Sequence, residues 1–239
     1  ALDEEAYRRG TSIYLVDKVI PMLPERLSNE LCSLRPNEDK LCMSVIVEMN
    51  QQAKVIRHKI CRTVIRSNHR LTYRQAQEML ENSLQLKVDS GQLREALQVL
   101  NGLAKQLRTN RFRQGAINFE TPEVRFLLDD AGNPTDVVFH RATDANHLIE
   151  EFMLLANRIV AAEIGKMPAT KNEKAEPKPF VYRVHHVPYP EKIVKLSNFI
   201  RQFGYHLRAS SKRSVQNKHI NQLLDSCHGT NNQTLIETL

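Results

Sequence analysis

The chain has 239 residues, of which 41% are hydrophobic and 26% charged, and its 8 glycines and 10 prolines exclude collagen-like, low-complexity and wholly disordered classes. This length suits one large domain or two small ones, with roughly 70% of the unfolded surface buried on folding. No run approaches the roughly 18 apolar residues of a membrane span, and the first residues lack the pattern of a secretory signal. We therefore expect a cytoplasmic protein without a membrane partner, and the start at Ala1 rather than Met makes the chain a candidate fragment.

The net charge of +7 is concentrated in one stretch. Residues 51–115 carry 13 Lys and Arg against 4 Asp and Glu, a net +9. We define the basic stripe by its closely spaced members: Arg57, Lys59, Arg62, Arg66, Arg70, Arg74, Arg108, Arg111 and Arg113. Such residues can neutralise phosphates by releasing counterions, and binding then weakens with salt. A solvated helix or strand face explains the same pattern, so charge alone leaves both interpretations open.

The first half of the chain predicts a loop-rich start followed by a hairpin. Three prolines break any long helix in the first forty residues, which leaves only residues 26–34 for a short one. Residues 43–49 and 53–65 have the composition of two strands joined near residues 50–52. In the second strand Ile56, Ile60 and Val64 alternate with polar neighbours, which predicts one apolar face.

Two helices are predicted next. Thr72 and Gln75 have the spacing of a capping box, and apolar residues then recur at helical intervals to about residue 87. A second, longer helix begins near residue 89 or 90. It carries leucines on one stripe and stops at Gly115.

The second half predicts a β meander, a long helix and a helical end. The strands are expected at residues 116–120, 124–128 and 135–140, and a helix of some twenty residues capped by Thr143 or Asp144 should be mostly buried. Residues 166–179 have the bias of an exposed, mobile loop, and residues 180–185 resemble a strand. Helices are expected at 191–203, 219–226 and from 235. These elements predict the α+β (mixed α/β) class.

Cysteine and histidine do not predict a metal site. His185-His186 has no partner at ligand spacing, and no Cys-x-x-Cys pair is present, so free buried thiols are the plainer interpretation of the four cysteines. These are Cys32, Cys42, Cys61 and Cys227.

The acidic residues do not predict a metal cluster either. A nuclease that uses metal ions needs several carboxylates that converge on one point. Asp129-Asp130 falls at the predicted hairpin turn, and Glu150-Glu151 falls on the polar flank of the long helix. Turn hydrogen bonding and a solvated flank account for these pairs.

Several motifs in order resemble the catalytic domain of the ribonuclease II and ribonuclease R family, with the ribonuclease R branch closer. The resemblance covers nearly the whole chain. Its motifs are residues 9–14 (RGTSIY), 19–25 (VIPMLPE), 27–34 (LSNELCSL), 70–73 (RLTY), 117–120 (INFE), 147–153 (HLIEEFM), 156–157 (AN) and 182–185 (YRVH).

The resemblance implies a processive exoribonuclease that hydrolyses single-stranded RNA from the 3′ end to nucleoside monophosphates, with Mg²⁺ held by an aspartate cluster. By position, Tyr14 matches the tyrosine beside the scissile end that helps set the length of the final product. Phe119 matches the aromatic residue that stacks on the 3′-terminal bases. Glu151, with Glu150 as the alternative, matches the glutamate that contacts RNA near the active centre. Taken alone, Phe119 is as well explained as a core residue, and Tyr14 as a surface or packing residue.

The resemblance also has departures. The family's magnesium-binding aspartates lie upstream of the 9–14 motif, and its paired arginines that grip the scissile phosphate follow beyond Leu239. We therefore expect the central part of such a domain, with metal ligands outside the chain and no activity of its own. His186 stands where the family usually has an aspartate. The alternatives are a non-catalytic RNA-binding or scaffold protein with this fold and, more weakly, an interaction domain that does not touch RNA.

Overall fold

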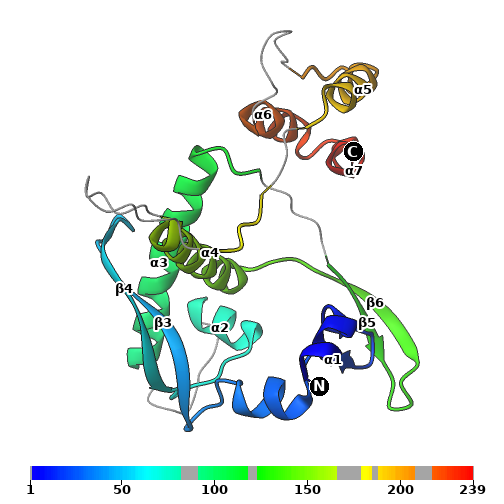
Figure 1. Cartoon of the computed structure of the whole chain (residues 1–239). Coiled ribbons are helices and arrows are strands. Elements are labelled where there is room, and N and C mark those ends of the chain that lie inside the picture. The colour runs from blue at the N-terminus through cyan, green and yellow to red at the C-terminus, as the bar shows by residue number, and fades with distance from the viewer. Residues whose placement is uncertain are drawn as a thin grey trace. The chain divides into compact units, whose positions relative to one another are not determined.

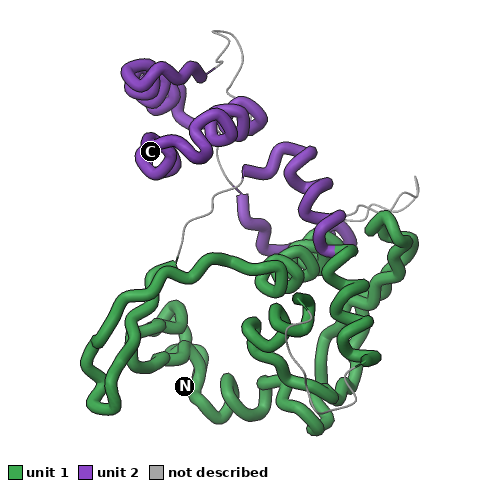
Figure 2. The backbone as a smooth tube through the Cα atoms, turned by 180° about the vertical axis from the view of Figure 1, so that it is seen from behind, with its two compact units in different colours: residues 1–103, 121–160 green, residues 104–120, 161–239 purple. Residues whose placement is uncertain are grey.

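The structure is a computed structural model that describes residues 2–81, 91–117, 123–165, 179–184, 188–207 and 217–238. The chain divides into two compact units, coloured green and purple in Figure 2. Unit 1 comprises residues 1–103 and 121–160, and unit 2 comprises residues 104–120 and 161–239. Helices accompany antiparallel strand pairs (Figure 1), so the predicted α+β class is confirmed.

A helix at the start of unit 1, α1 (Leu2–Arg9), contradicts the expectation of an irregular first segment. Acidic side chains occupy its first turn and basic side chains its last, which suits the helix dipole. Glu5 pairs with Arg8 at 2.5 Å and with Arg9 at 2.7 Å, and the hydrogen bond from Arg9 lowers the pKa of the Glu5 carboxyl. Local ion pairs stabilise this helix, because none of its residues is buried.

Two further elements lie in the predicted loop-rich segment. Strands β1 (Ile13–Tyr14) and β2 (Val19–Ile20) form a short antiparallel ribbon. A single wide helical turn of the π type, η1 (Arg26–Leu31), stands where the short helix is expected.

The predicted hairpin is confirmed, with β3 (Asp39–Met49) antiparallel to β4 (Val55–Arg66). Asn50 closes the turn, because its Oδ1 accepts hydrogen bonds from the backbone N–H of Gln52 at 3.0 Å and Lys54 at 2.9 Å. Ala53 takes a left-handed backbone conformation there, with φ 57°.

The covered face of this hairpin changes halfway along it. In β3 the even-numbered residues are half-buried up to Ser44. From Val45 onward the odd-numbered residues are half-buried instead. Strand twist accumulates over such a length and turns the first face away from its neighbours. The predicted apolar face of β4 is therefore wrong in part: Ile60 is half-buried, whereas Ile56 and Val64 are exposed.

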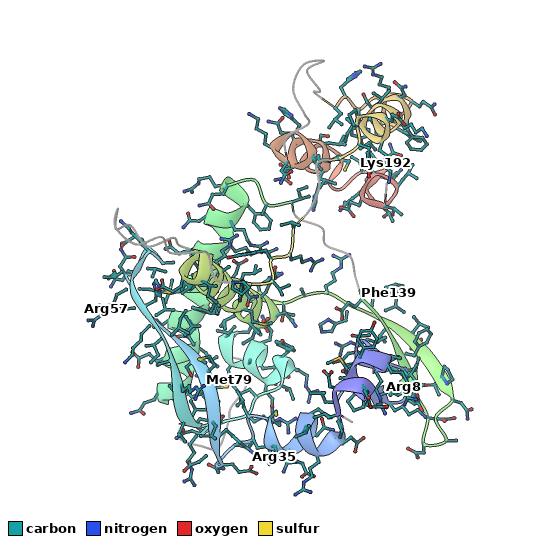
Figure 3. All side chains as sticks on the ribbon, in the orientation of Figure 1. Arg8, Arg35, Arg57, Met79, Phe139 and Lys192 are labelled. Atoms are coloured by element: carbon teal, nitrogen blue, oxygen red, sulfur yellow. The ribbon has the colours of Figure 1, made fainter. Side chains whose placement is uncertain are left out.

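Helix α2 (Tyr73–Leu80) begins at the predicted capping box. The Thr72 hydroxyl accepts from the Gln75 backbone N–H at 3.2 Å, and the Thr72 backbone N–H donates to Gln75 Oε1 at 2.9 Å. Met79, labelled in Figure 3, is fully buried. The helix ends at Leu80, earlier than predicted, and residues 82–90 lie outside the described part of the chain.

The two long helices occur where predicted. Helix α3 (Gly91–Arg113) ends just before Gly115, whose φ of +97° suits glycine at a helix end. Helix α4 (Asp144–Gly165) starts after Thr143, whose hydroxyl and backbone N–H both donate to Asn146 Oδ1, at 2.8 and 3.0 Å.

Helix α4 is less buried than its apolar pattern predicts. Leu148 and Ile159 are buried, but Ile149 and Met153, on the predicted apolar face, are exposed. The expectation of a mostly buried helix therefore holds for only part of its circumference.

The second hairpin pairs β5 (Glu123–Leu128) with β6 (Pro134–His140). Asp129 organises the turn: its carboxylate accepts from the backbone N–H of Asn133 at 2.8 Å and of Ala131 at 2.9 Å. These hydrogen bonds, led by those from Asn133, lower the pKa of Asp129. Of the strand expected at residues 116–120, the first two residues are not in a strand and the others lie outside the described part.

The described residues of the C-terminal part of unit 2 form three helices, all close to their predicted positions. They are α5 (Pro190–Arg201), α6 (Asn217–Cys227) and α7 (Gln233–Thr238). Their apolar sides and Leu207 form one core, in which Ile200 and Cys227 are fully buried.

The strand expected at residues 180–185 is wrong for the residues that the structure describes. Residues 180–184 have no strand pairing, and Val181 and Val184 are exposed. Tyr182 lies against the end of α4 instead. Its hydroxyl oxygen is 2.7 Å from the point where a Cβ would stand if Gly165 carried a side chain. Apolar alternation alone does not form a strand without a partner edge. Pro179 is the one residue of the expected 166–179 loop within the described part.

The cysteines are all free thiols, as expected, but only Cys227 is buried, and Cys32 is exposed. Across the described ranges, no helix combines the length and apolar character needed to cross a membrane.

Candidate nucleic-acid interface

Tyr14 lies in β1 of unit 1, where it is opposite Val19 in the β1–β2 ribbon. Its side chain is 78% exposed, so it does not serve as a core residue. Ile13, Leu15 and Val16 beside it are exposed as well. The ribbon therefore presents an aromatic ring among apolar neighbours, which suits stacking against a base.

Two hydrogen bonds hold the ribbon on α1 and on the segment that follows β2. Arg9 Nη1 donates to the backbone carbonyl of Pro21 at 2.7 Å, and the Met22 backbone N–H donates to Ser12 Oγ at 3.0 Å. Gly10 lies between them with φ +70°, a backbone conformation that glycine adopts easily and that a residue with a Cβ adopts only at a steric cost. The Arg9–Ser12 motif thus fixes the chain on which Tyr14 stands.

Glu151 and Glu150 lie on α4 in different environments. Glu151 is 3% exposed, whereas Glu150 is exposed. The interpretation of both residues as a solvated helix flank is therefore wrong for Glu151. A carboxylate is rarely buried without a structural or functional reason, because desolvation penalises its charged form.

The N-terminus of α4 is fixed to two other helices of unit 1. The Ala145 backbone N–H donates to Gln77 Oε1 of α2 at 3.0 Å, and Asn101 Nδ2 of α3 lies 3.4 Å from Asp144 Oδ2. Because Glu151 lies less than two turns beyond these contacts, its position is set by a rigid support.

Other candidate residues fall outside the described part of the chain. Phe119, the predicted stacking residue, is one of them, as are His185 and His186. Tyr14 and Glu151 both lie in unit 1, the first on β1 and the second on α4. The structure therefore brings no complete set of candidate residues together.

The basic stripe is divided between the two units. Its members up to Arg74 belong to unit 1, and Arg108, Arg111 and Arg113 belong to unit 2. Within β4, Arg57 pairs with Glu48, and Arg66 lies 4.0 Å from Asp39. The net charge of +9 is thus divided between the units and partly neutralised on the hairpin.

The arginines of unit 2 are organised around an aromatic ring. The guanidinium carbons of Arg108 and Arg111 lie 4.8 and 5.0 Å from the centroid of the Phe112 ring. Such cation–π contacts orient the guanidinium groups at the end of α3.

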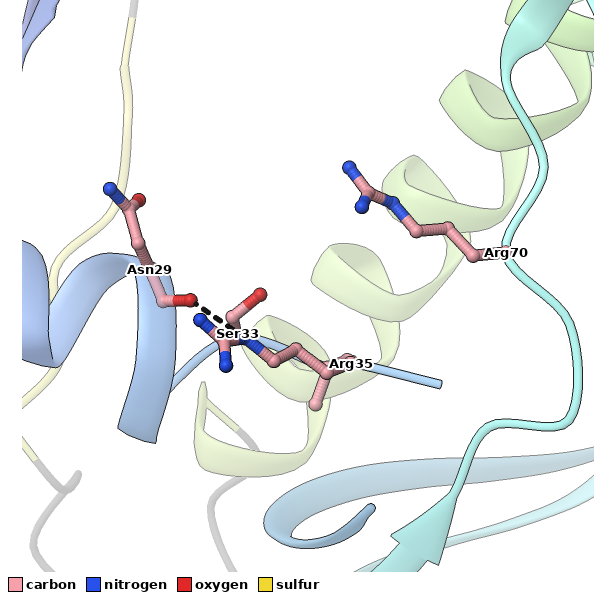
Figure 4. A pocket seen from close by; sticks show the side chains of 5 residues that line it. Asn29, Ser33, Arg35 and Arg70 are labelled. Carbon is pink, nitrogen blue, oxygen red and sulfur yellow. Dashed lines mark hydrogen bonds between the residues drawn. The ribbon is translucent and has the colours of Figure 1, made fainter. Parts of the chain in front are cut away.

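A pocket of about 310 Å³ lies in unit 1 near two arginines, Arg35 and Arg70 (Figure 4). Asn29, Ser33 and Leu34 complete its lining. Arg70 belongs to the basic stripe, whereas Arg35 is not predicted from the sequence, because residues 1–50 are acidic overall.

The described residues do not fit a magnesium site. Among them, no group of three or more His, Cys, Asp or Glu side chains lies together in a geometry that could hold a metal ion. Asp129 instead uses its oxygens for turn hydrogen bonds. No catalytic step through a metal is therefore derived from this part of the chain.

The family model for the RNB domain matches residues 1–239. This chain belongs to the RNB domain family. Ribonuclease R of Thermotoga maritima is 40% identical over 213 residues, which cover 89% of this chain and 29% of that protein. The resemblance to the ribonuclease II and ribonuclease R family is thereby confirmed. The chain spans less than a third of this relative's length.

Two solved structures extend the comparison. Mycoplasma genitalium RNase R in complex with ribose-methylated single-stranded RNA matches with a TM-score of 0.84 at 25% identity, over 99% of this chain and 35% of that one. Yeast Ssd1, a pseudonuclease, matches with a TM-score of 0.66 at 16% identity, over 99% of this chain and 27% of that one. The second likeness concerns the fold alone.

Proposed function

We propose that the chain is the central part of the catalytic domain of a 3′ to 5′ exoribonuclease similar to ribonuclease R. The complete enzyme would act in the cytoplasm and hydrolyse single-stranded RNA processively to nucleoside monophosphates. Its Mg²⁺ would be held by residues outside this chain. The observation that carries this proposal is the 40% identity to a ribonuclease R over 89% of the chain. The fold match to an RNA-bound RNase R supports RNA as the partner.

In this proposal the chain binds and orients RNA. Tyr14 lies beside the scissile end, Phe119 stacks on the 3′-terminal bases, and Glu151, or else Glu150, contacts RNA near the active centre. The exposure of Tyr14 agrees with its role. Of the two glutamates, Glu150 is exposed and accessible to RNA, whereas Glu151 is 3% exposed and fits a supporting position better than a direct contact. Stacking on aromatic rings is worth about 1–3 kcal/mol per base and does not depend on base identity, which suits a degradative enzyme.

A non-catalytic RNA-binding protein is the second candidate. It is favoured by the fold that the chain shares with the pseudonuclease Ssd1. Sequencing the gene on both sides of this segment separates the two. An aspartate cluster before residue 1 and an arginine pair after residue 239 support the enzyme, and their absence supports the binding protein.

An assay of the 239-residue chain tests the RNA-binding part of the proposal. With labelled single-stranded RNA and Mg²⁺, we expect binding that weakens with salt, and no shortening of the RNA. Processive shortening by pure chain would contradict the placement of the metal ligands outside it. Lack of RNA binding would contradict the proposed RNA contacts.

A variant at Phe119 tests the stacking role separately. Phe119→Ala should weaken binding of single-stranded RNA about 5-fold or more, from the loss of one stacked base. Phe139→Ala is the matched control, because Phe139 is an exposed phenylalanine on β6 (Figure 3). Equal affinities for the two variants would remove Phe119 from the interface.

A further inference from the structure

The pocket beside Arg35 and Arg70 has the chemistry of an anion site. Its lining contains two guanidinium groups, the polar side chains of Asn29 and Ser33, and no carboxylate. Figure 4 shows the Arg70 side chain reaching toward the space beside Asn29 and Arg35. A guanidinium group remains charged at any physiological pH, so the lining carries two positive charges.

The backbone holds the two arginines near each other. Arg35 lies just before Pro36, which bridges Ser67, and the Asn37 backbone N–H donates to the Ser67 carbonyl at 2.7 Å. Arg70 follows Ser67 by one short turn. The pocket is therefore formed by two directly connected segments, and folding of unit 1 sets its width.

Arg35 is oriented, and its terminal nitrogens remain available. Its Nε donates to the Asn29 carbonyl at 3.1 Å, the dashed line in Figure 4. Its Nη1 is 3.9 Å from Glu38 Oε1, too long for a hydrogen bond. The other Glu38 oxygen is 2.7 Å from Lys40 Nζ, and this lysine is the main cause of the lowered pKa of Glu38. Glu38 is thus bound chiefly to Lys40 and competes weakly for Arg35.

Arg70 has a different setting. Its side chain is exposed, and within the described residues no hydrogen bond or ion pair engages its guanidinium group. The preceding turn is closed locally, because Ser67 Oγ donates to the His69 carbonyl at 3.0 Å. The following helix is capped by Thr72. Arg70 therefore projects from a fixed backbone with its donors unused by those elements.

We propose that this pocket binds a phosphate group through Arg35 and Arg70. Guanidinium groups match phosphate oxygens in paired hydrogen bonds, and two of them on a fixed frame neutralise one phosphate. The phosphate comes from the backbone of a bound single-stranded RNA or from free inorganic phosphate. The RNA source rests on the proposed function, whereas the free-phosphate source does not.

Fluorescence anisotropy with a labelled single-stranded RNA tests the first source. Arg35→Ala and Arg70→Ala should each weaken binding about 5-fold at 0.1 M salt, and the double variant should reduce the slope of log affinity against log salt by about 0.7, the contribution of one phosphate. Arg125→Ala is the matched control, since Arg125 is an exposed arginine on β5 that pairs with Glu123 at 3.8 Å and belongs neither to the pocket nor to the basic stripe. Arg70→Lys should retain part of the salt dependence, and circular dichroism checks folding.

Titration with inorganic phosphate, followed by NMR of arginine Nε–H signals, tests the second source and reports on the pocket even if the chain binds no RNA. Shifts at Arg35 and Arg70 that saturate and disappear in the variants support the proposal. RNA affinities that change only for the pocket variants also support it and identify the RNA source. If the pocket variants match Arg125→Ala in RNA binding and phosphate causes no shifts, the proposal is overturned. If the wild-type chain binds phosphate but not RNA, the proposed function fails and the pocket stands.

Discussion

Helices α5 to α7 of unit 2 bury their apolar side chains, whereas the strands of unit 1 leave many of theirs in solvent. Ile200 of α5 is 0% exposed, and Leu41 of β3 is 89% exposed. The helices share a core built from their own side chains, whereas many side chains on the described two-stranded hairpins have no layer packed over them. We infer that side-chain burial stabilises the C-terminal helices, and that the hairpins depend mainly on strand pairing and present side chains for contact.

Truncation of one side chain in each region gives the largest expected contrast. Ile200→Ala should lower the free energy of unfolding of the C-terminal helices by about 2–5 kcal/mol, because it leaves a cavity in their core. Leu41→Ala should change stability by about 0.5 kcal/mol or less, because the side chain is already in water. Urea denaturation followed by circular dichroism measures both. Similar effects of the two substitutions would contradict the comparison.

A substitution at Glu151 tests whether buried side chains also stabilise unit 1. Glu151→Ala should destabilise the chain by about 1–3 kcal/mol, since it leaves the partners of a buried carboxylate unsatisfied. Glu150→Ala, at the exposed neighbouring position, is the control and should stay within about 0.5 kcal/mol. Thermal denaturation without RNA isolates this structural effect. If both variants unfold like the wild type, Glu151 has no structural role and acts only toward RNA.

The rates at which the cysteine thiols react should show the same difference between the buried helical core and the exposed part of unit 1. Burial raises the pKa of the Cys227 thiol, and the residue is fully enclosed by the C-terminal helices, whereas Cys32 is exposed. We expect iodoacetamide to modify Cys32 at least about 10-fold faster than Cys227, because the Cys227 thiol becomes accessible only when the helices unfold locally. Mass spectrometry of peptides over time measures the two rates. Ile200→Ala should reduce the difference between the two modification rates, because it destabilises the helical core. Equal rates in the wild type would mean that the helical core is open.

The smallest effect concerns the turn of the second hairpin. Because hydrogen bonds lower the folded-state pKa of Asp129 below 3.8, its contribution to stability is complete above that value and is lost as the pH falls through the lower, folded pKa. An NMR titration of the Asp129 carboxyl should therefore have its midpoint below 3.8. Asn133→Ala removes one side-chain donor and should raise the midpoint. A wild-type midpoint at or above 3.8 would show that the turn does not bind the carboxylate.

The sequence predicts elements whose signals are local. The capping box of Thr72 and Gln75, the hairpin turn near Asn50 and the glycine after α3 act through neighbouring residues, and all three occur where expected. Helix α1 is not predicted, because the prolines in the first forty residues favour an irregular segment, but Glu5 forms ion pairs with Arg8 and Arg9 within it. Its stabilising contacts were nevertheless visible in the spacing of acidic and basic residues.

Features that depend on distant partners are not predictable in this way. A period of two cannot reveal that the β3–β4 hairpin changes its covered face, because that change arises from twist and from what packs on each half. Nor does it reveal that residues 180–184 have no strand to pair with. The burial of Glu151 and the approach of Arg35 to Arg70 depend on tertiary contacts, so only the structure discloses them.

The central claim is that the exposed surface of unit 1 contacts RNA through Tyr14. The most direct test compares the affinity of the 239-residue chain for a labelled single-stranded RNA with that of Tyr14→Ala and Tyr7→Ala. Tyr7 is the matched control, a tyrosine of the same unit that is 90% exposed on α1. We predict that Tyr14→Ala weakens binding about 5-fold or more and that Tyr7→Ala leaves it unchanged. Equal affinities for the two variants, or a wild-type chain that does not bind RNA, would contradict the claim.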